Sequence, residues 1–214
     1  MIDKIKAALW KNGSFLSQII MYMIDSQTRE RVDVSKFLNN QITDKESLEI
    51  LIRIRDNNNL MRYTKDIRAM KIRDFVQNFL TYQDDMSRYN SVEHWASIKE
   101  ILEKLVGDCE DGAILIYCLM RISGFNENEV QLITGYVINP FDNKKVGHCW
   151  INYISDKYPY VNYFLDWCYY PDKTRIHNKR ECFSLRKGLI YSGTKQDDRY
   201  LSYWFLATDK QGWK

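Results

Sequence analysis

The sequence predicts an α+β protein in which helices come first and an antiparallel sheet follows. Apolar side chains recur at helical spacing through most of residues 1–122. Residues 130–169 instead hold runs rich in β-branched and aromatic side chains, and short polar turns separate these runs. Helices followed by strands with hairpin-length connections are typical of the α+β class. A chain of 214 residues with 45% hydrophobic residues can bury a core without disulfides or metals.

The N-terminal region carries two apolar stripes, over residues 2–9 and 15–24. The second is the longest apolar run, yet it includes Ser17 and Gln18 and is too short to span a bilayer. It also lacks a small-residue cleavage site. We therefore expect a core-facing helix there, and neither a membrane span nor a signal peptide.

The middle of the chain holds a capping box, Thr43 to Glu46, in which an N-cap hydroxyl is followed three residues later by a carboxylate. It predicts a helix that Asn57–Asn59 end. A long helix is expected from residue 67 to about 82, followed by a polar loop over 84–90. Two shorter helices are expected over 95–105 and 113–122, and strands over 130–138, 146–154, 160–169 and 200–207.

Charge and cysteine content exclude several classes of protein. The net charge is +3 with both signs interspersed, which leaves no footprint for nucleic-acid binding. The five cysteines are sparse and odd in number, which favours free thiols in a reducing compartment over a disulfide scaffold. No CxxC or HxxxH pair is present, so a structural zinc site of the usual spacing is not expected.

A cysteine stands at the predicted start of an apolar helix, in the run Gly107-Asp108-Cys109-Glu110-Asp111-Gly112. Asp108 is a good N-cap, which would put Cys109 in the first helical turn. The unpaired backbone N–H groups of that turn favour a thiolate, and they can bind the oxyanion that forms when a carbonyl is attacked. The pattern predicts a cysteine nucleophile.

The two strands that follow supply candidate partners. Alternation along Gly147-His148-Cys149-Trp150 places His148 and Trp150 on one face of the strand and Cys149 on the other. Asp166 stands in an apolar run on the next strand, where a carboxylate is costly unless it is paired. On neighbouring antiparallel strands the two side chains can meet. Asp166 would then hold the imidazole, and His148 would take the thiol proton.

These segments resemble the transglutaminase-like superfamily, and most closely its bacterial and phage-type cysteine proteinases. The resemblance covers residues 67–169, and its motifs are GDCEDGA at 107–113, GHCW at 147–150 and LD at 165–166. The positions that match the family's triad are Cys109, His148 and Asp166. Cys149 departs from the family pattern, which more often has a small residue between the histidine and the tryptophan.

The resemblance implies a papain/transglutaminase-like core, in which a nucleophile helix packs on an antiparallel sheet. We place this cysteine hydrolase core at residues 63–214 and a helical N-terminal extension at 1–62, as two units or as one continuous domain. The implied activity is acyl transfer through a thioester acyl-enzyme. Hydrolysis of a protein or peptide substrate, by a protease or amidase that requires no cofactor, is the favoured outcome.

Three alternatives stay open. The first is a protein-crosslinking transglutaminase, since the chemistry up to the acyl-enzyme is the same. The second is a non-catalytic assembly protein, for example a phage virion component that docks a partner through residues 1–60. The third is a cell-wall peptidase of another Cys-His class. With no membrane or secretion signal, we expect a cytoplasmic or virion-associated protein rather than a periplasmic one.

The carboxylates beside the nucleophile pose a physical problem. Asp108, Glu110 and Asp111 suit a helix N-terminus, but three negative charges there should raise the pKa of the Cys109 thiol. Capping and salt bridges can occupy them, or a cation can neutralise them. Some members of the resembled family use calcium at such a cluster. We favour capping, because a calcium ion needs six to eight oxygen ligands and three adjacent residues cannot supply them alone.

Trp150 and Trp167 flank the predicted triad. We expect them to wall it, and a second interpretation makes them lining residues of a substrate groove.

Overall fold

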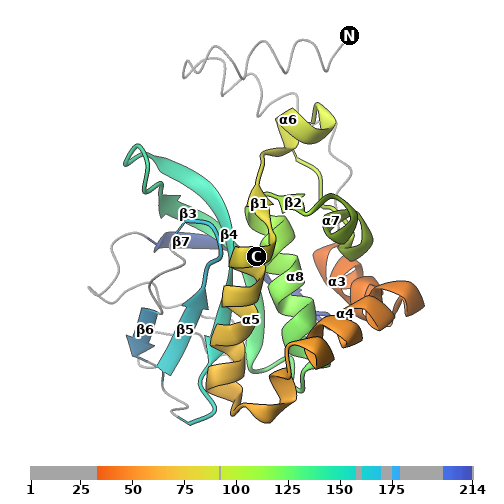
Figure 1. The fold of residues 1–214 in the computed structure, drawn as a ribbon. Helices are drawn as coiled ribbons and strands as arrows, with labels where there is room; N and C mark the ends of the chain where they lie inside the picture. Colours follow the sequence, from red (N-terminus) through yellow and green to blue (C-terminus); the bar gives the residue numbers. More distant parts are fainter. Residues whose placement is uncertain (1–32, 92, 158–160, 170–174, 179–199, 214) are drawn as a thin grey trace.

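The computed structural model describes residues 33–91, 93–157, 161–169, 175–178 and 200–213. Within these ranges the chain forms a group of helices and one large curved sheet, which lie side by side in Figure 1. The two helices predicted over residues 2–9 and 15–24 lie outside the described residues, as does about half of the predicted extension 1–62. No helix among the described residues is long and apolar enough to cross a membrane.

Helices make up most of the described chain before residue 123. They are α3 (Val34–Thr43), α4 (Lys45–Asn57), the 3-10 turn η1 (Leu60–Arg62), α5 (Lys65–Phe79), α6 (Asp85–Tyr89), α7 (Ile98–Lys104) and α8 (Cys109–Ile122). The long predicted helix corresponds to α5, and α4 ends at Asn57 as expected.

Two local predictions in this region were wrong. The N-cap of α4 is Asp44, whose Oδ2 accepts from the Ser47 backbone N–H at 2.8 Å, and Thr43 is the last residue of α3. The predicted polar loop over 84–90 contains the short helix α6. Its N-cap Asp84 accepts from the Ser87 N–H at 3.0 Å. In both places an aspartate side chain satisfies a free N–H group at a helix start.

The large sheet is antiparallel throughout, with strand order β6-β5-β4-β3-β7-β8. Its strands are β3 (Val130–Ile138), β4 (Lys145–Ile154), β5 (Val161–Leu165), β6 (Arg175–Asn178), β7 (Tyr200–Ala207) and β8 (Gly212–Trp213). The first two match the predicted boundaries within one residue. The strand predicted over 160–169 ends at Leu165, so Asp166 lies in the bend that follows it. A small parallel pair, β1 (Thr81–Tyr82) and β2 (Val106–Gly107), leads into α8.

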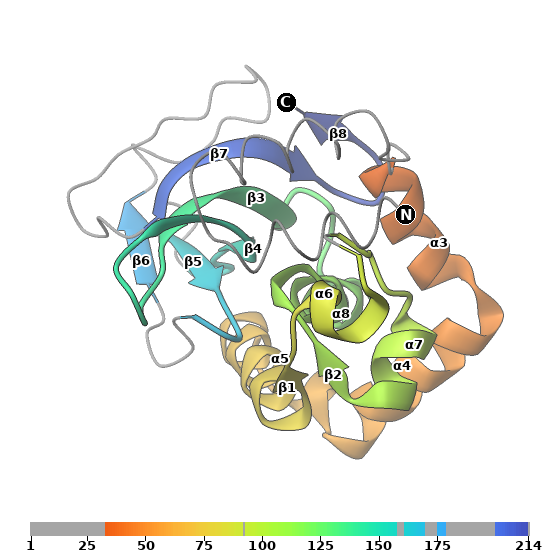
Figure 2. The same cartoon turned by 90° about the horizontal axis from the view of Figure 1, so that it is seen from above.

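Helix α8 lies at the centre of the molecule, with the sheet on one side and α3, α4 and α5 around the others (Figure 2). It is apolar on all sides, as a helix enclosed by other elements must be, and every residue from Glu110 to Met120 is buried. The predicted alternation along β4 is confirmed. Cys149, Ile151 and Tyr153 join the main core with α8, whereas Trp150 belongs to a second cluster.

Candidate active site

The candidate nucleophile Cys109 is the first residue of α8, and Asp108 is the N-cap. The backbone N–H of Asp108 donates to Asp111 Oδ2 at 3.4 Å, which satisfies one of the free donors at the helix start. Cys109 is partly exposed, and its Sγ donates to Glu110 Oε2 at 3.1 Å. The thiol lies at the end of the helix where anions are stabilised, with a carboxylate as its acceptor.

The second glycine of the GDCEDG motif is explained by close packing against the sheet. A Cβ at Gly112 would lie 2.1 Å from Trp167 Nε1, a distance no side chain tolerates. The absence of that Cβ lets the indole lie on α8, where Nε1 donates to the carbonyl oxygen of Cys109 at 3.3 Å. This contact ties the bend after β5, which carries Asp166, to the first turn of the nucleophile helix.

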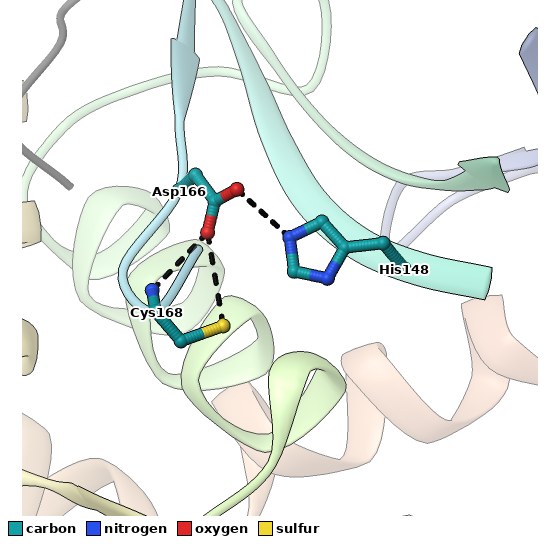
Figure 3. A group of neighbouring side chains, drawn as sticks. All are labelled: His148, Asp166 and Cys168. Atoms are coloured by element: carbon teal, nitrogen blue, oxygen red, sulfur yellow. Dashed lines mark hydrogen bonds and ion pairs between the residues drawn. The ribbon is translucent and has the colours of Figure 1, made fainter. Parts of the chain in front are cut away.

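The structure brings His148 and Asp166 together, as their places on β4 and after β5 predict. His148 Nε2 and Asp166 Oδ2 are 2.8 Å apart, and both side chains are fully buried (Figure 3). Tyr200 donates its hydroxyl to Oδ2 at 2.7 Å, and the backbone N–H groups of Cys168 and Tyr169 donate to Oδ1 at 3.1 and 3.2 Å. Every oxygen of the carboxylate is thus satisfied.

These contacts decide the ionisation of Asp166. Desolvation would raise the pKa of Asp166, but the charge of His148 and the hydrogen bonds from His148 and Tyr200 outweigh it and hold that pKa below its usual value. Because Asp166 is an ionised acceptor, Nε2 of His148 carries the proton that it donates. The lone pair of the neutral ring is then on Nδ1.

The Nδ1 atom of His148 is the nitrogen left for chemistry. It is buried and has no hydrogen-bond partner among the described residues. The imidazole stacks on the ring of Tyr169, with the two ring centroids 4.3 Å apart and an interplanar angle of 3°. Among the described residues no hydrogen bond joins Nδ1 to Cys109 Sγ, whose acceptor is Glu110. The imidazole of His148 is thus oriented with an unpartnered Nδ1, and the thiol of Cys109 donates to Glu110.

A cluster of buried carboxylates explains this arrangement. Carboxylate oxygens of Asp85, Asp108 and Glu110 all lie within 4.8 Å of one another, and the residues are 1%, 8% and 6% exposed. Desolvation, followed by repulsion from neighbouring carboxylates, raises the pKa of Asp85 to about 7 and that of Asp108 to about 8. It raises the pKa of Glu110 well above its usual value. Oδ1 of Asp85 and Oδ1 of Asp108 have no hydrogen-bond partner among the described residues.

Asp111 is not a member of this cluster, contrary to the predicted set of calcium ligands. Its Oδ2 forms an ion pair with the buried guanidinium of Arg88, and its Oδ1 accepts from the backbone N–H of Ala96 at 3.1 Å. Capping and a salt bridge therefore occupy Asp111, as the favoured interpretation expects. Asp108 also caps α8 through its capping box with Asp111, but its Oδ1 has no hydrogen-bond partner among the described residues. The third carboxylate beside Asp108 and Glu110 is Asp85 from α6. Sequence reasoning missed Asp85, because only the fold brings α6 against the start of α8.

The same carboxylates act on the nucleophile. Desolvation, followed by the charges of Glu110 and Asp108, raises the pKa of the Cys109 thiol well above its usual value. In this state the sulfur keeps its proton.

Both tryptophans predicted to flank the triad are buried. Trp150 is fully buried between β-sheet side chains, with its ring centroid 6.0 Å from that of His148, and Trp167 is 4% exposed. Their roles as walls of the site or as lining of a substrate groove stay predictions. The exposed aromatic rings beside the site are others. Tyr82 of β1 is 46% exposed and Phe141 of the β3–β4 turn is 81% exposed. Their centroids lie 6.4 and 6.2 Å from that of Tyr169.

Comparison with known proteins supports this assignment of the fold. Residues 59–163 match the family described as the transglutaminase-like superfamily, a segment that holds Cys109 and His148 and ends before Asp166. No curated protein matches the chain.

Solved structures of Legionella pneumophila LapG are similar to the chain. The calcium-bound form has 21% identity and a TM-score of 0.48, over 72% of this chain and 74% of that one. Two further LapG structures, one of them EGTA-treated, have 17% identity and a TM-score of 0.47, over 99% of this chain and 86% and 84% of theirs. The segment 59–163 is therefore a domain of the transglutaminase-like superfamily.

Proposed function

We propose that the protein is a cysteine acyl-transfer enzyme, a protease or amidase, with Cys109 as nucleophile, His148 as base and Asp166 as the residue that orients the base. The observation that carries the proposal is the buried His148–Asp166 pair, whose remaining nitrogen is unpartnered. The contact between Trp167 and the backbone of Cys109 ties this pair to the start of the nucleophile helix. The superfamily includes cysteine proteases.

The geometry supports the following steps. Cys109 Sγ attacks the carbonyl carbon of the substrate, and its proton passes to Nδ1 of His148. The oxyanion that forms lies near the free N–H groups of the first turn of α8. His148 then gives its proton to the departing amine, the C–N bond breaks and a thioester remains. Water attacks the thioester with His148 as base, which releases the acid and restores the thiol.

Asp166 serves the imidazole rather than the substrate. As an ionised acceptor it fixes the proton on Nε2, and it stabilises the imidazolium that forms when Nδ1 is protonated. Tyr200 and the two backbone donors keep the carboxylate in place.

Cys168 also lies near His148 and Asp166, so the choice of nucleophile needs a reason. Cys168 is in a bend after β5 and begins no helix, so it offers no set of free N–H groups to an oxyanion. Cys109 begins a helix of 14 residues and lies in the segment that matches the superfamily. We therefore assign the nucleophile to Cys109.

The residues of the carboxylate cluster fit a hard cation such as calcium. Two of their buried oxygens lack hydrogen-bond partners, and carboxylate oxygens are the ligands calcium prefers. Asp85, Asp108 and Glu110 would hold the ion, with water or substrate completing its coordination. Its positive charge would offset the carboxylates that now keep Cys109 protonated. We include calcium activation in the proposal on this ground.

The substrate side of the site is assigned to the exposed aromatic rings. Tyr82 and Tyr169 stand beside the nucleophile helix and the imidazole, and Phe141 extends the row from the β3–β4 turn. A protein or peptide in extended form would lay apolar side chains against them.

We also keep as proposals that the protein is cytoplasmic or virion-associated and that a partner binds residues 1–60.

Two other outcomes are open at the same site. If a lysine amine resolves the thioester, the protein crosslinks; if no thioester forms, it is an assembly protein with a retained site. A peptide library from a digested proteome, incubated with the calcium-loaded full chain, separates them. We expect new peptide termini that are absent with Cys109→Ala. Incorporation of an added primary amine without cleavage would show a transglutaminase. If neither product forms, the proposal is overturned in favour of an assembly role.

A further inference from the structure

Cys168 is not used by the proposed mechanism, yet it lies against the His–Asp pair. Its Sγ is 3.8 Å from Asp166 Oδ1, and its backbone N–H donates to the same oxygen. In Figure 3 Cys168 and His148 approach the two oxygens of the Asp166 carboxylate from different elements. Ligand atoms of the three residues all lie within 4.8 Å of one another. An imidazole nitrogen, a carboxylate oxygen and a thiolate sulfur form a ligand set that Zn²⁺ prefers.

A second observation fits a metal bound at Nε2 of His148. The residue is 3% exposed, and its Nδ1 is buried without a hydrogen-bond partner among the described residues, so the ring proton can move from Nε2 to Nδ1 and leave the lone pair of Nε2 to the ion. The separations also suit zinc. With Zn–N near 2.0 Å and Zn–S near 2.3 Å, the ligand atoms of a tetrahedral site lie roughly 3–4 Å apart. The distance of 3.8 Å between Cys168 Sγ and Asp166 Oδ1 falls in this range, and that of 2.8 Å between His148 Nε2 and Asp166 Oδ2 falls just below it.

We propose that His148, Asp166 and Cys168 form a binding site for Zn²⁺, and that zinc at this site inhibits the enzyme by holding its base. On binding, the Cys168 thiol loses its proton to solvent and a Zn–S bond forms. The two charges of the ion are matched by the thiolate and the Asp166 carboxylate, so no net charge is buried. Cys168 is partly exposed, which gives the ion a route of entry.

The zinc site differs in chemistry from the carboxylate cluster. Asp85, Asp108 and Glu110 offer oxygen alone, which suits calcium, whereas the site at Cys168 offers nitrogen, sulfur and oxygen. The two metals should therefore separate between the two places and act on Cys109 in opposite directions. The zinc site itself does not depend on the proposed function; the inhibition does.

The test is a titration of the full chain with Co²⁺, which reports its own ligands, and with Zn²⁺. We expect one ion per chain and a near-ultraviolet sulfur-to-cobalt charge-transfer band. Cys109→Ser is the matched control, because it removes the other thiol that is partly exposed among the described residues, and it should keep the band. Cys168→Ser should abolish the band and weaken zinc binding at least about tenfold. If Cys168→Ser does not fold, protection of Cys168 from iodoacetamide by zinc in the wild-type chain gives the same information.

The outcomes that overturn the site are a missing band in the wild type, a band that survives in Cys168→Ser, or a band that is lost in Cys109→Ser. Inhibition is read separately, as slower reaction of Cys109 with iodoacetamide when zinc is present. If Cys109 shows no special reactivity without zinc, the proposed function fails while the cobalt band still decides the metal site. If Cys109 is reactive and the band is absent, the zinc site alone fails.

Discussion

The sheet and the helix contribute to the candidate site in opposite electrostatic states. On the sheet side, Asp166 is buried but accepts hydrogen bonds from a side chain on β4, a side chain on β7 and two backbone N–H groups. On the helix side, Asp85, Asp108 and Glu110 are equally buried and repel one another. The pKa of the first carboxyl is lowered, whereas the pKa values of the other three are raised.

This difference divides the candidate site into two parts. The His148–Asp166 pair is preorganised, whereas the state of Cys109 depends on what binds to the carboxylates beside it. The proposed base His148 and its partner Asp166 need nothing further, because their charges are satisfied within the fold. The proposed nucleophile Cys109 depends on the charge of the carboxylates around it. Protons or a cation must occupy them, and only a cation also favours the thiolate. The following changes would break or sharpen this comparison.

Asp166→Asn should have the largest effect, because it changes the carboxylate on the sheet side, whose hydrogen bonds orient His148. An amide can turn its N–H₂ group toward His148 and place the ring proton on Nδ1, the wrong nitrogen. We expect Cys109-dependent peptide cleavage to fall about 10³- to 10⁴-fold while the fold persists. Cleavage rates measured beside Asp74→Asn, a half-exposed carboxylate on α5 that pairs with Arg73, check this. Equal rates in both variants would remove Asp166 from the mechanism.

Gly112→Ala should disrupt the contact between Trp167 and α8, which joins the sheet side of the site to the helix side. The added methyl lies 2.1 Å from Trp167 Nε1, so the indole must move away from α8. We expect a loss of about 1–3 kcal/mol in the free energy of unfolding by urea. In the double variant Gly112→Ala, Trp167→Leu, the loss should be smaller than the sum of the two single losses. Additive losses would show that the two residues do not pack as described.

The pH dependence of the free energy of unfolding should reveal the raised pKa values of the carboxylates on the helix side. With raised folded pKa values of about 7 for Asp85 and about 8 for Asp108, the metal-free folded state binds more protons than the unfolded chain above pH 4. Its stability should therefore fall as pH rises from 5 to 8, by up to about 1.4 kcal/mol per pH unit for each such proton. Melting curves in EDTA measure this.

Two controls belong to the pH experiment. Glu110→Gln removes one of the repelling charges, and millimolar calcium offsets all of them, so each should flatten the slope. A slope that is the same in EDTA and in calcium would count against a cation at Asp85, Asp108 and Glu110.

Tyr200→Phe should have the smallest effect. It removes one of several donors to Asp166, a hydroxyl 2.7 Å from Oδ2, and leaves His148 in place. We expect a loss of about 1 kcal/mol in unfolding free energy and a modest fall in cleavage rate. Tyr63→Phe, whose ring lies under Lys71 on the helical side, is the control for loss of a phenol elsewhere. A loss as large as that of Asp166→Asn would show that the other donors do not hold the carboxylate.

What the sequence could predict follows the range of the interactions. The bounds of β3 and the faces of β4 follow from alternation and from the turn residues between the strands, all of which are local. The meeting of His148 with Asp166 could be predicted because neighbouring strands fix it. Asp85 could not be placed, because its burial depends on packing between α6 and α8. The ion pair between Asp111 and Arg88 could not be predicted either, because the two residues are 23 positions apart in the sequence.

The tryptophans show the same limit. Their positions flanking the triad were predicted, but their burial was not. Trp150 is covered by side chains of β5 and β7, and Trp167 is buried because Gly112 makes room for it. No local pattern in the sequence carries either contact.

The most direct test is the rate at which iodoacetamide modifies each cysteine of the full chain at neutral pH, read by peptide mass, in calcium and in EGTA. Cys168, the other thiol that is partly exposed in the described part of the chain, is the internal reference, and His148→Ala is the control. We predict that in calcium Cys109 reacts at least about tenfold faster than Cys168, and that EGTA or His148→Ala removes the advantage. If Cys109 reacts no faster than Cys168 in either condition, or is indifferent to His148, it is not an activated nucleophile.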